Sequence, residues 1–367
     1  MTATPTIPPL AHELMDGSVP GFGQVIRDAA RRMRDAGYDE TVPLSPEALL
    51  ERSELRGYFQ ALDATWVAGG TDPDDAWADV TLLTAHAHYA LAFELHRRKT
   101  FWVDESLAFM LAMTRLDVRG EGLRLPFPSF ALVFTDRETL AIGEALAERD
   151  PDAHVRGQAL RSLTVYVTRV AADTGRLGLH LSLLLDANRG GWPWLMTRDL
   201  LVRPEDDLDA IIESRFPDVE VATLAPLFSA PELRQLVQLI INAILFATSS
   251  PSWPVITPPP RAGTAVLSRR GTKKHARAVR RLENQRRRET GEAVWHLPGK
   301  IPISQIRALR ELRQTTEGGA LFSRSMVRGH WRRAPDTWTD PRPRWIEPYW
   351  KGPELGAIVE REYRLEP

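Results

Sequence analysis

Apolar residues recur three and four positions apart along the N-terminal part of the chain, and this spacing predicts helices. The first helix is expected over 22–36, where Gly37 is well placed to end it. Its apolar stripe consists of Val25, Ile26, Ala29, Ala30 and Met33. Ser45 and Pro46 have the chemistry of a helix cap and first turn, which predicts a second helix over 45–66. Two further helices are expected over 72–98 and 103–116.

The pattern changes near residue 130 to one typical of strands. The short apolar run 130–134 predicts a strand, and Thr135 with Glu138 predicts a capping box for a helix over 135–149. Strands are expected over 163–171 and 177–185, with leucine at every odd position of the second. The turn residues 173–175 between them indicate a β-hairpin.

Two helices are expected next, over 204–215 and from Ser229 onwards. The second is the most hydrophobic element of the chain, although Gln238 and Asn242 interrupt its apolar run. A membrane span needs about 20 consecutive apolar residues, so we interpret this helix as buried core.

These patterns predict an α+β fold: a helical N-terminal body with a small antiparallel sheet, followed by a small β-rich C-terminal module. We expect a flexible N-terminus over 1–20 and an α+β domain over 21–248. Five prolines predict a linker over 249–264. A basic helix or connector is expected over 265–290, and an aromatic β-rich module over 291–367.

Charge changes sign within the expected linker. Residues 1–260 hold 23 Lys and Arg against 36 Asp and Glu, whereas residues 261–367 hold 24 against 12. An acidic body with a basic C-terminal region indicates a polyanionic partner, and nucleic acid is the first candidate. Whether that partner is DNA or RNA stays open.

The strongest basic cluster would place its cations on one side of a helix. Its members are Arg270, Lys273, Lys274, Arg277, Arg280 and Arg281. Such a stripe could contact successive phosphates. It could also be a solvated connector without a ligand, or it could dock on the acidic body of the same chain.

A second cluster interleaves aromatic and charged residues in two expected adjacent strands. The nucleic-acid-binding candidates there are Trp331, Arg332 and Arg344, because aromatic rings can stack on bases while arginines bind phosphates. A metal-independent ribonuclease is the second interpretation, with the catalytic candidates His330, Arg328, Glu347 and Tyr349. The third interpretation is a small domain that uses tryptophan as its core.

The segments VRGHWRR at 327–333 and RWIEPYWKG at 344–352 follow the basic run. Together with LVQLIINAILFATSS at 236–250, they resemble uncharacterised proteins of bacteria, phages and plasmids. The resemblance covers 120–352 and implies a mobile-element, phage or bacterial-defence setting. It assigns no catalytic residue.

Other chemistry is weakly represented. The chain has no cysteine, which excludes disulfides, Cys-ligated zinc and thiol nucleophiles. His86 and His88 diverge by about 200° on a helix, so we expect no metal site and no cofactor. We expect a cytoplasmic protein without a signal peptide or a membrane partner. A protein partner, or self-association through the oppositely charged halves, remains an alternative to nucleic acid.

Overall fold

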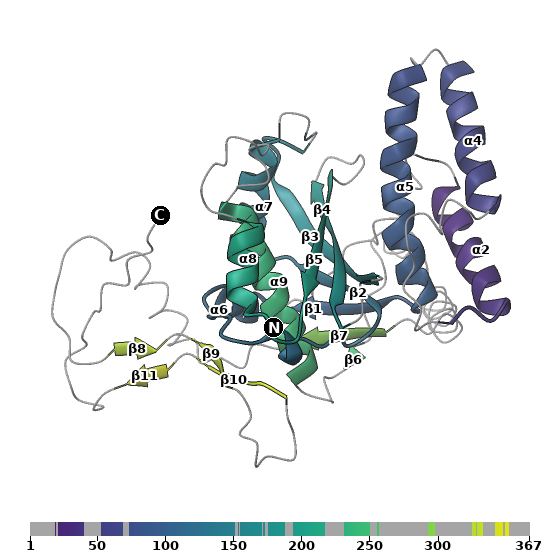
Figure 1. The fold of residues 1–367 in the computed structure, drawn as a ribbon. Helices are drawn as coiled ribbons and strands as arrows, with labels where there is room; N and C mark the ends of the chain where they lie inside the picture. The colour runs from purple at the N-terminus through teal and green to yellow at the C-terminus, as the bar shows by residue number, and fades with distance from the viewer. Residues whose placement is uncertain are drawn as a thin grey trace, which may run out of the picture.

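The computed structural model describes residues 19, 21–39, 53–68, 73–150, 153, 155–170, 172, 175–187, 194–216, 231–249, 255–256, 293–297, 325–327, 329–332, 342–347 and 349–351. Over these residues the chain is an α+β protein, which confirms the predicted class. One large sheet lies between two groups of helices (Figure 1).

The sheet has the strand order β5-β4-β3-β2-β1-β7-β6 in the part of the chain that the structure describes. β1 is parallel to β2 and to β7, and the other neighbouring pairs are antiparallel. The sheet is therefore mixed, and larger than the antiparallel sheet we expected. The strands are β1 Lys99–Val103, β2 Ser129–Phe134, β3 Leu160–Val170, β4 Leu177–Ala187, β5 Trp194–Val202, β6 Val255–Ile256 and β7 Ala293–Leu297.

The predicted hairpin is confirmed, because β3 pairs antiparallel with β4 over nearly its whole length. The leucines at odd positions 179–185 of β4 belong to one hydrophobic core, whereas Leu184 belongs to another. Side chains alternate between the faces of a strand, so this division shows that both faces of the sheet are covered.

The first core lies under α2 Phe22–Asp35, α4 Ser53–Ala68 and α5 Pro73–Leu95. α5 packs on the sheet, whose Ala131, Tyr166 and Leu184 belong to this core, and α2 and α4 pack against α5. Tyr166 stacks on Tyr89 of α5 with ring centroids 4.5 Å apart. The expected helix over 22–36 is confirmed, and Gly37 follows it at a φ of 77°, the left-handed conformation that favours glycine at a helix end.

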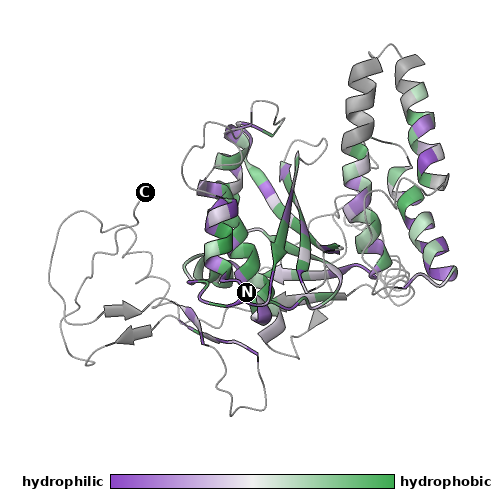
Figure 2. Cartoon of the chain, in the orientation of Figure 1, coloured by the Kyte–Doolittle hydropathy of each residue, from purple (hydrophilic) through white to green (hydrophobic). Residues whose placement is uncertain are grey.

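The second core lies on the other face, under α6 Glu105–Ala112, α7 Arg137–Glu148, α8 Leu208–Arg215 and α9 Pro231–Ser249. Every residue of α9 from Leu239 to Ala247 is buried, in agreement with the expected core helix. In Figure 2 hydrophobic residues predominate along α9 and along the strands of the sheet.

Several expectations from the sequence are wrong. The segment 103–116 is not one helix: Lys99–Val103 forms β1, and α6 begins after Asp104, which accepts a hydrogen bond from the Ser106 amide. The cap of α7 is Asp136 rather than Thr135, because the Asp136 carboxylate accepts from the Thr139 amide at 2.8 Å. The sequence patterns also missed β5.

The helix expected over 204–215 begins later, at Leu208. Asp207 caps it, since its carboxylate accepts from the Ala210 amide at 3.0 Å. Replacing Asp207 with alanine should lower the free energy of unfolding by about 1 kcal/mol, as loss of a helix cap typically does. Glu205→Ala is the control, because this exposed acid lies just before the helix and has no capping bond. Urea denaturation followed by circular dichroism measures both; equal losses would contradict Asp207 as the cap.

The C-terminal segment contributes directly to this body. β7 lies between β1 and β6, so the main sheet crosses the boundary expected at 291. Trp331 belongs to the core beneath α9. β8 Ser325–Val327 pairs with β11 Tyr349–Lys351, and β9 His330–Arg332 pairs with β10 Arg344–Ile346. Each of the two strands expected over 321–333 and 344–351 is therefore divided into two short strands, which form two antiparallel pairs.

Candidate functional site

The β9–β10 pair carries most of the described residues that the sequence singled out. Its register sets Arg344 opposite Arg332, Trp345 opposite Trp331 and Ile346 opposite His330. Because opposed residues of an antiparallel pair point to the same face, the two tryptophans share one face and the two arginines share the other.

The tryptophan face is anchored to the body by a buried hydrogen-bond network. Trp331 is 3% exposed, and its Nε1 donates to Oδ1 of Asn242 at 2.8 Å. The Asn242 amide donates in turn to the carbonyls of Leu111 and Thr114, at 2.9 and 3.1 Å. One side chain of α9 thus joins β9 to the end of α6.

A second set of contacts holds β10 and the chain before β9. Trp345 Nε1 donates to the hydroxyl of Thr114 at 3.3 Å, and its ring packs edge-on against Phe246. The Arg115 amide donates to the carbonyl of Gly329 at 3.2 Å. These bonds fix the β9–β10 pair relative to α6 and α9.

The arginine face points to solvent. Arg332 and Arg344 are both exposed and directly opposed across the pair. The planar fork of arginine suits phosphate and carboxylate, and two arginines at opposed positions can contact the same anion.

The other predicted site residues are distributed differently. His330 is half-buried, Glu347 is exposed just after β10, and Tyr349 lies in the separate β8–β11 pair. Trp331 is buried in the core and is therefore not placed to stack on a base. Arg328 and the basic cluster Arg270, Lys273, Lys274, Arg277, Arg280 and Arg281 lie outside the described residues.

The residue that sequence reasoning missed is Asn242. The signal was present, because Gln238 and Asn242 are four positions apart and therefore share one side of an apolar helix. Both donate to the Thr114 carbonyl, Gln238 at 3.1 Å. Polar residues at helical spacing within a buried stripe indicate a specific polar contact across the core.

His86 contacts another residue of α5, whereas His88 contacts the sheet. His86 Nδ1 lies 2.7 Å from the Tyr89 hydroxyl, and the His88 ring packs edge-on against His180. His180 donates from Nδ1 to the Asp199 carboxylate at 2.7 Å, and this hydrogen bond lowers the pKa of Asp199. No group of three or more potential metal ligands occurs among the described residues. No helix within the described part of the chain has the length and hydropathy of a membrane span.

Fold and site together define an α+β protein whose described C-terminal strands pack on the body and present two opposed arginines. The chain belongs to the AcrVA2-like family, described as the anti-CRISPR type V subtype A2 family, whose model matches residues 101–335. The matched residues include β1 from Phe101 onwards, helices α6 to α9 and the Asn242–Trp331 contact. Membership agrees with the phage or mobile-element setting implied by the C-terminal segments.

Two other comparisons complete this result. No curated protein matches the chain. Among solved structures, the crystal structure of AcrVA2 is similar with a TM-score of 0.45 and 9% sequence identity, over 95% of this chain and 97% of that chain.

Proposed function

We propose that this protein inhibits a type V CRISPR system and contacts nucleic acid through Arg332 and Arg344. Family membership supports the inhibitory role. The observation that carries the contact is the opposed arginine pair on strands that Asn242 and Thr114 fix to the body. Because the backbone beneath the two arginines is already ordered, binding a phosphate costs conformational entropy only in their side chains.

The inhibitory role is tested in cells that carry a type V effector programmed against a plasmid. Expression of the protein should restore transformation by the targeted plasmid. A CRISPR effector of another type, programmed against the same plasmid, serves as the specificity control. Continued loss of the plasmid in the type V strain would refute the inhibitory role.

The nucleic-acid contact is tested with purified protein and labelled single- and double-stranded DNA and RNA. Arg332→Glu with Arg344→Glu should weaken binding at least tenfold. It should also flatten the dependence of affinity on salt by roughly 0.7 to 0.9 in log–log slope for each phosphate that the protein no longer neutralises. An electrophoretic mobility assay over a salt series measures both.

The matched control is Arg27→Glu with Arg31→Glu, which makes the same charge change on α2, on the other side of the sheet. Equal weakening by both double variants would mean that net charge alone governs binding. Unchanged binding by the Arg332 and Arg344 variant would exclude this pair and favour a protein partner. Cleavage of the labelled RNA by the wild type, but not by His330→Ala, would instead support the ribonuclease alternative.

A further inference from the structure

A pocket of about 460 Å³ lies at the turn end of the β3–β4 hairpin, away from the residues discussed above. Three chain segments form its wall: the stretch 120–128, the β3–β4 turn, and the end of β5 with Pro204. Its volume falls in the range of small-molecule sites in proteins, about 300–1,000 Å³. None of its lining residues comes from the β9–β10 pair.

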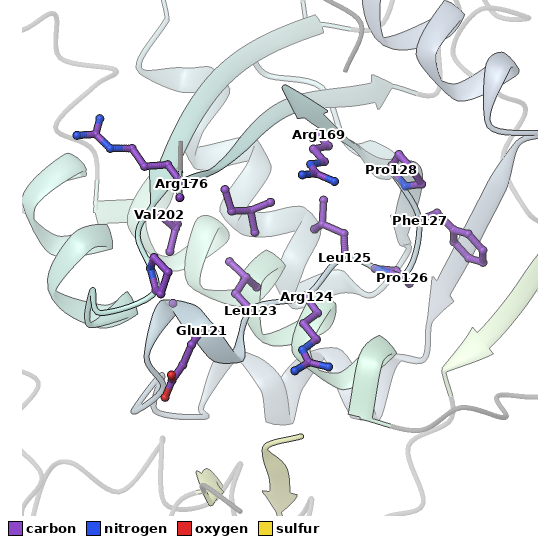
Figure 3. A pocket seen from close by; sticks show the side chains of 14 residues that line it. Glu121, Leu123, Arg124, Leu125, Pro126, Phe127, Pro128, Arg169, Arg176 and Val202 are labelled. Carbon is purple, nitrogen blue, oxygen red and sulfur yellow. The ribbon is translucent and has the colours of Figure 1, made fainter. Parts of the chain in front are cut away.

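The charged groups around this pocket are mostly cationic. Arg124, Arg169 and Arg176 line it, against the single carboxylate of Glu121. In Figure 3 the guanidinium of Arg169 extends toward the other lining side chains, whereas Glu121 extends away from Arg169. Neither Arg124 nor Arg169 forms an ion pair with a carboxylate that the structure describes. The guanidinium groups of Arg124 and Arg176 extend away from that of Arg169 in Figure 3, so Arg169 is the cation placed to contact a ligand in this pocket.

The remaining wall is apolar and held in place. Leu123 is part of the core, and Leu125, Phe127 and Leu177 pack against it. The Phe127 ring lies 5.1 Å from that of Trp295 in β7. Arg169 is positioned by its own backbone, because its amide donates to the Pro128 carbonyl at 2.7 Å. The backbone that carries Arg169 is thus fixed relative to the apolar wall.

We propose that this pocket binds a nucleoside phosphate, with the phosphate on Arg169 and the base on the apolar wall. A phosphate monoester carries a charge of about −1.5 to −2 at neutral pH, so it interacts with the Arg169 guanidinium more strongly than a single carboxylate does. Arginine binds phosphate through two parallel hydrogen bonds. The base needs a flat apolar surface of the kind that the leucine and proline side chains provide. The proposal does not depend on the proposed function.

Binding of 5′-AMP to the full chain, measured by isothermal titration calorimetry, tests this site. Adenosine without the phosphate should bind at least tenfold more weakly. Arg169→Ala should weaken 5′-AMP binding by about tenfold to a hundredfold, the usual effect of losing hydrogen bonds to a charged group. Arg31→Ala, which removes an exposed arginine from α2, should leave the affinity unchanged.

A second variant tests the cavity without changing its charge. Leu125→Trp adds bulk to the apolar wall and should abolish binding, while circular dichroism confirms that the variant is folded. The Arg332→Glu and Arg344→Glu variant should bind 5′-AMP as the wild type does. The test of this pocket is therefore independent of the test of the proposed function.

The source of the phosphate is distinguished by competition. Displacement of 5′-AMP by a short RNA with a 5′-phosphate, but not by the same RNA with a 5′-hydroxyl, would identify an RNA end as the ligand. Displacement by neither would identify a free nucleotide. The proposal would be overturned by absence of 5′-AMP binding at millimolar concentration. It would also be overturned by unchanged binding to Arg169→Ala, or by stronger displacement with a glutamate-rich peptide than with any phosphorylated competitor.

Discussion

Replacing Asn242 with leucine is expected to lower the free energy of unfolding by about 3 kcal/mol. Leucine has the same branching and number of side-chain heavy atoms as asparagine and is larger, so the substitution leaves no cavity and removes hydrogen bonds. The substitution leaves the buried Nε1–H of Trp331 without its acceptor, and an unsatisfied buried donor costs about 1–3 kcal/mol. It also removes the two bonds to the Leu111 and Thr114 carbonyls. Urea denaturation followed by circular dichroism measures the change.

Gln238→Ala is the matched control, because Gln238 lies one turn earlier on α9 and makes one partly buried hydrogen bond. Its removal should cost about 1 kcal/mol. The double variant Asn242→Leu with Trp331→Phe provides a sharper test. Removing both partners should cost less than the sum of the two single effects, because no donor is then left unsatisfied. Additive effects would show that the two side chains are not coupled.

The second large effect is expected at Gly120, where two backbone segments come unusually close. A Cβ atom at this position would lie 1.9 Å from the carbonyl oxygen of Arg203 and 2.6 Å from Cγ1 of Val202. The Gly120 amide also donates to the Asp206 carbonyl at 2.8 Å, which holds the segments together. Alanine must therefore push them apart, and we expect Gly120→Ala to lower the free energy of unfolding by about 3 kcal/mol. Because Gly120 also lines the pocket that contains Arg169, the variant should weaken 5′-AMP binding as well.

Gly57→Ala is the control for this prediction, since a Cβ atom there meets nothing within 4 Å. Gly57 lies within α4, where alanine is favoured over glycine by about 0.5–1 kcal/mol. The two substitutions should therefore change stability in opposite directions in the same urea experiment. A Gly120→Ala protein as stable as the wild type would show that the segments separate at little cost.

Several elements followed from short stretches of sequence. The helix 22–35, the hairpin of β3 and β4, and the core helix α9 each have apolar residues at the period of their own structure. A local period fixes which side of an element is buried, because side-chain direction repeats with the backbone geometry. β1 was missed because its five residues include Lys99 and Thr100 and precede a helical pattern directly.

The candidate site followed only in part. Alternation in β9 correctly separates Trp331 from its neighbours His330 and Arg332. It does not say which side meets the body, and the structure places Trp331 in the core, away from any stacking position. The pocket lined by Arg124, Arg169 and Arg176 left no trace in the sequence patterns, since Arg124 lies far along the chain from the hairpin that carries the other two.

The sequence by itself determined the α+β class, the helical N-terminal part, the hairpin and the apolar stripe of α9. These depend on propensity and periodicity within one element. Only the tertiary structure decided the parallel pairing of β1 with β7, the bond between Asn242 and Trp331, and the grouping of three arginines around one pocket. Each joins residues far apart along the chain, and such contacts form because the whole core can be buried at once.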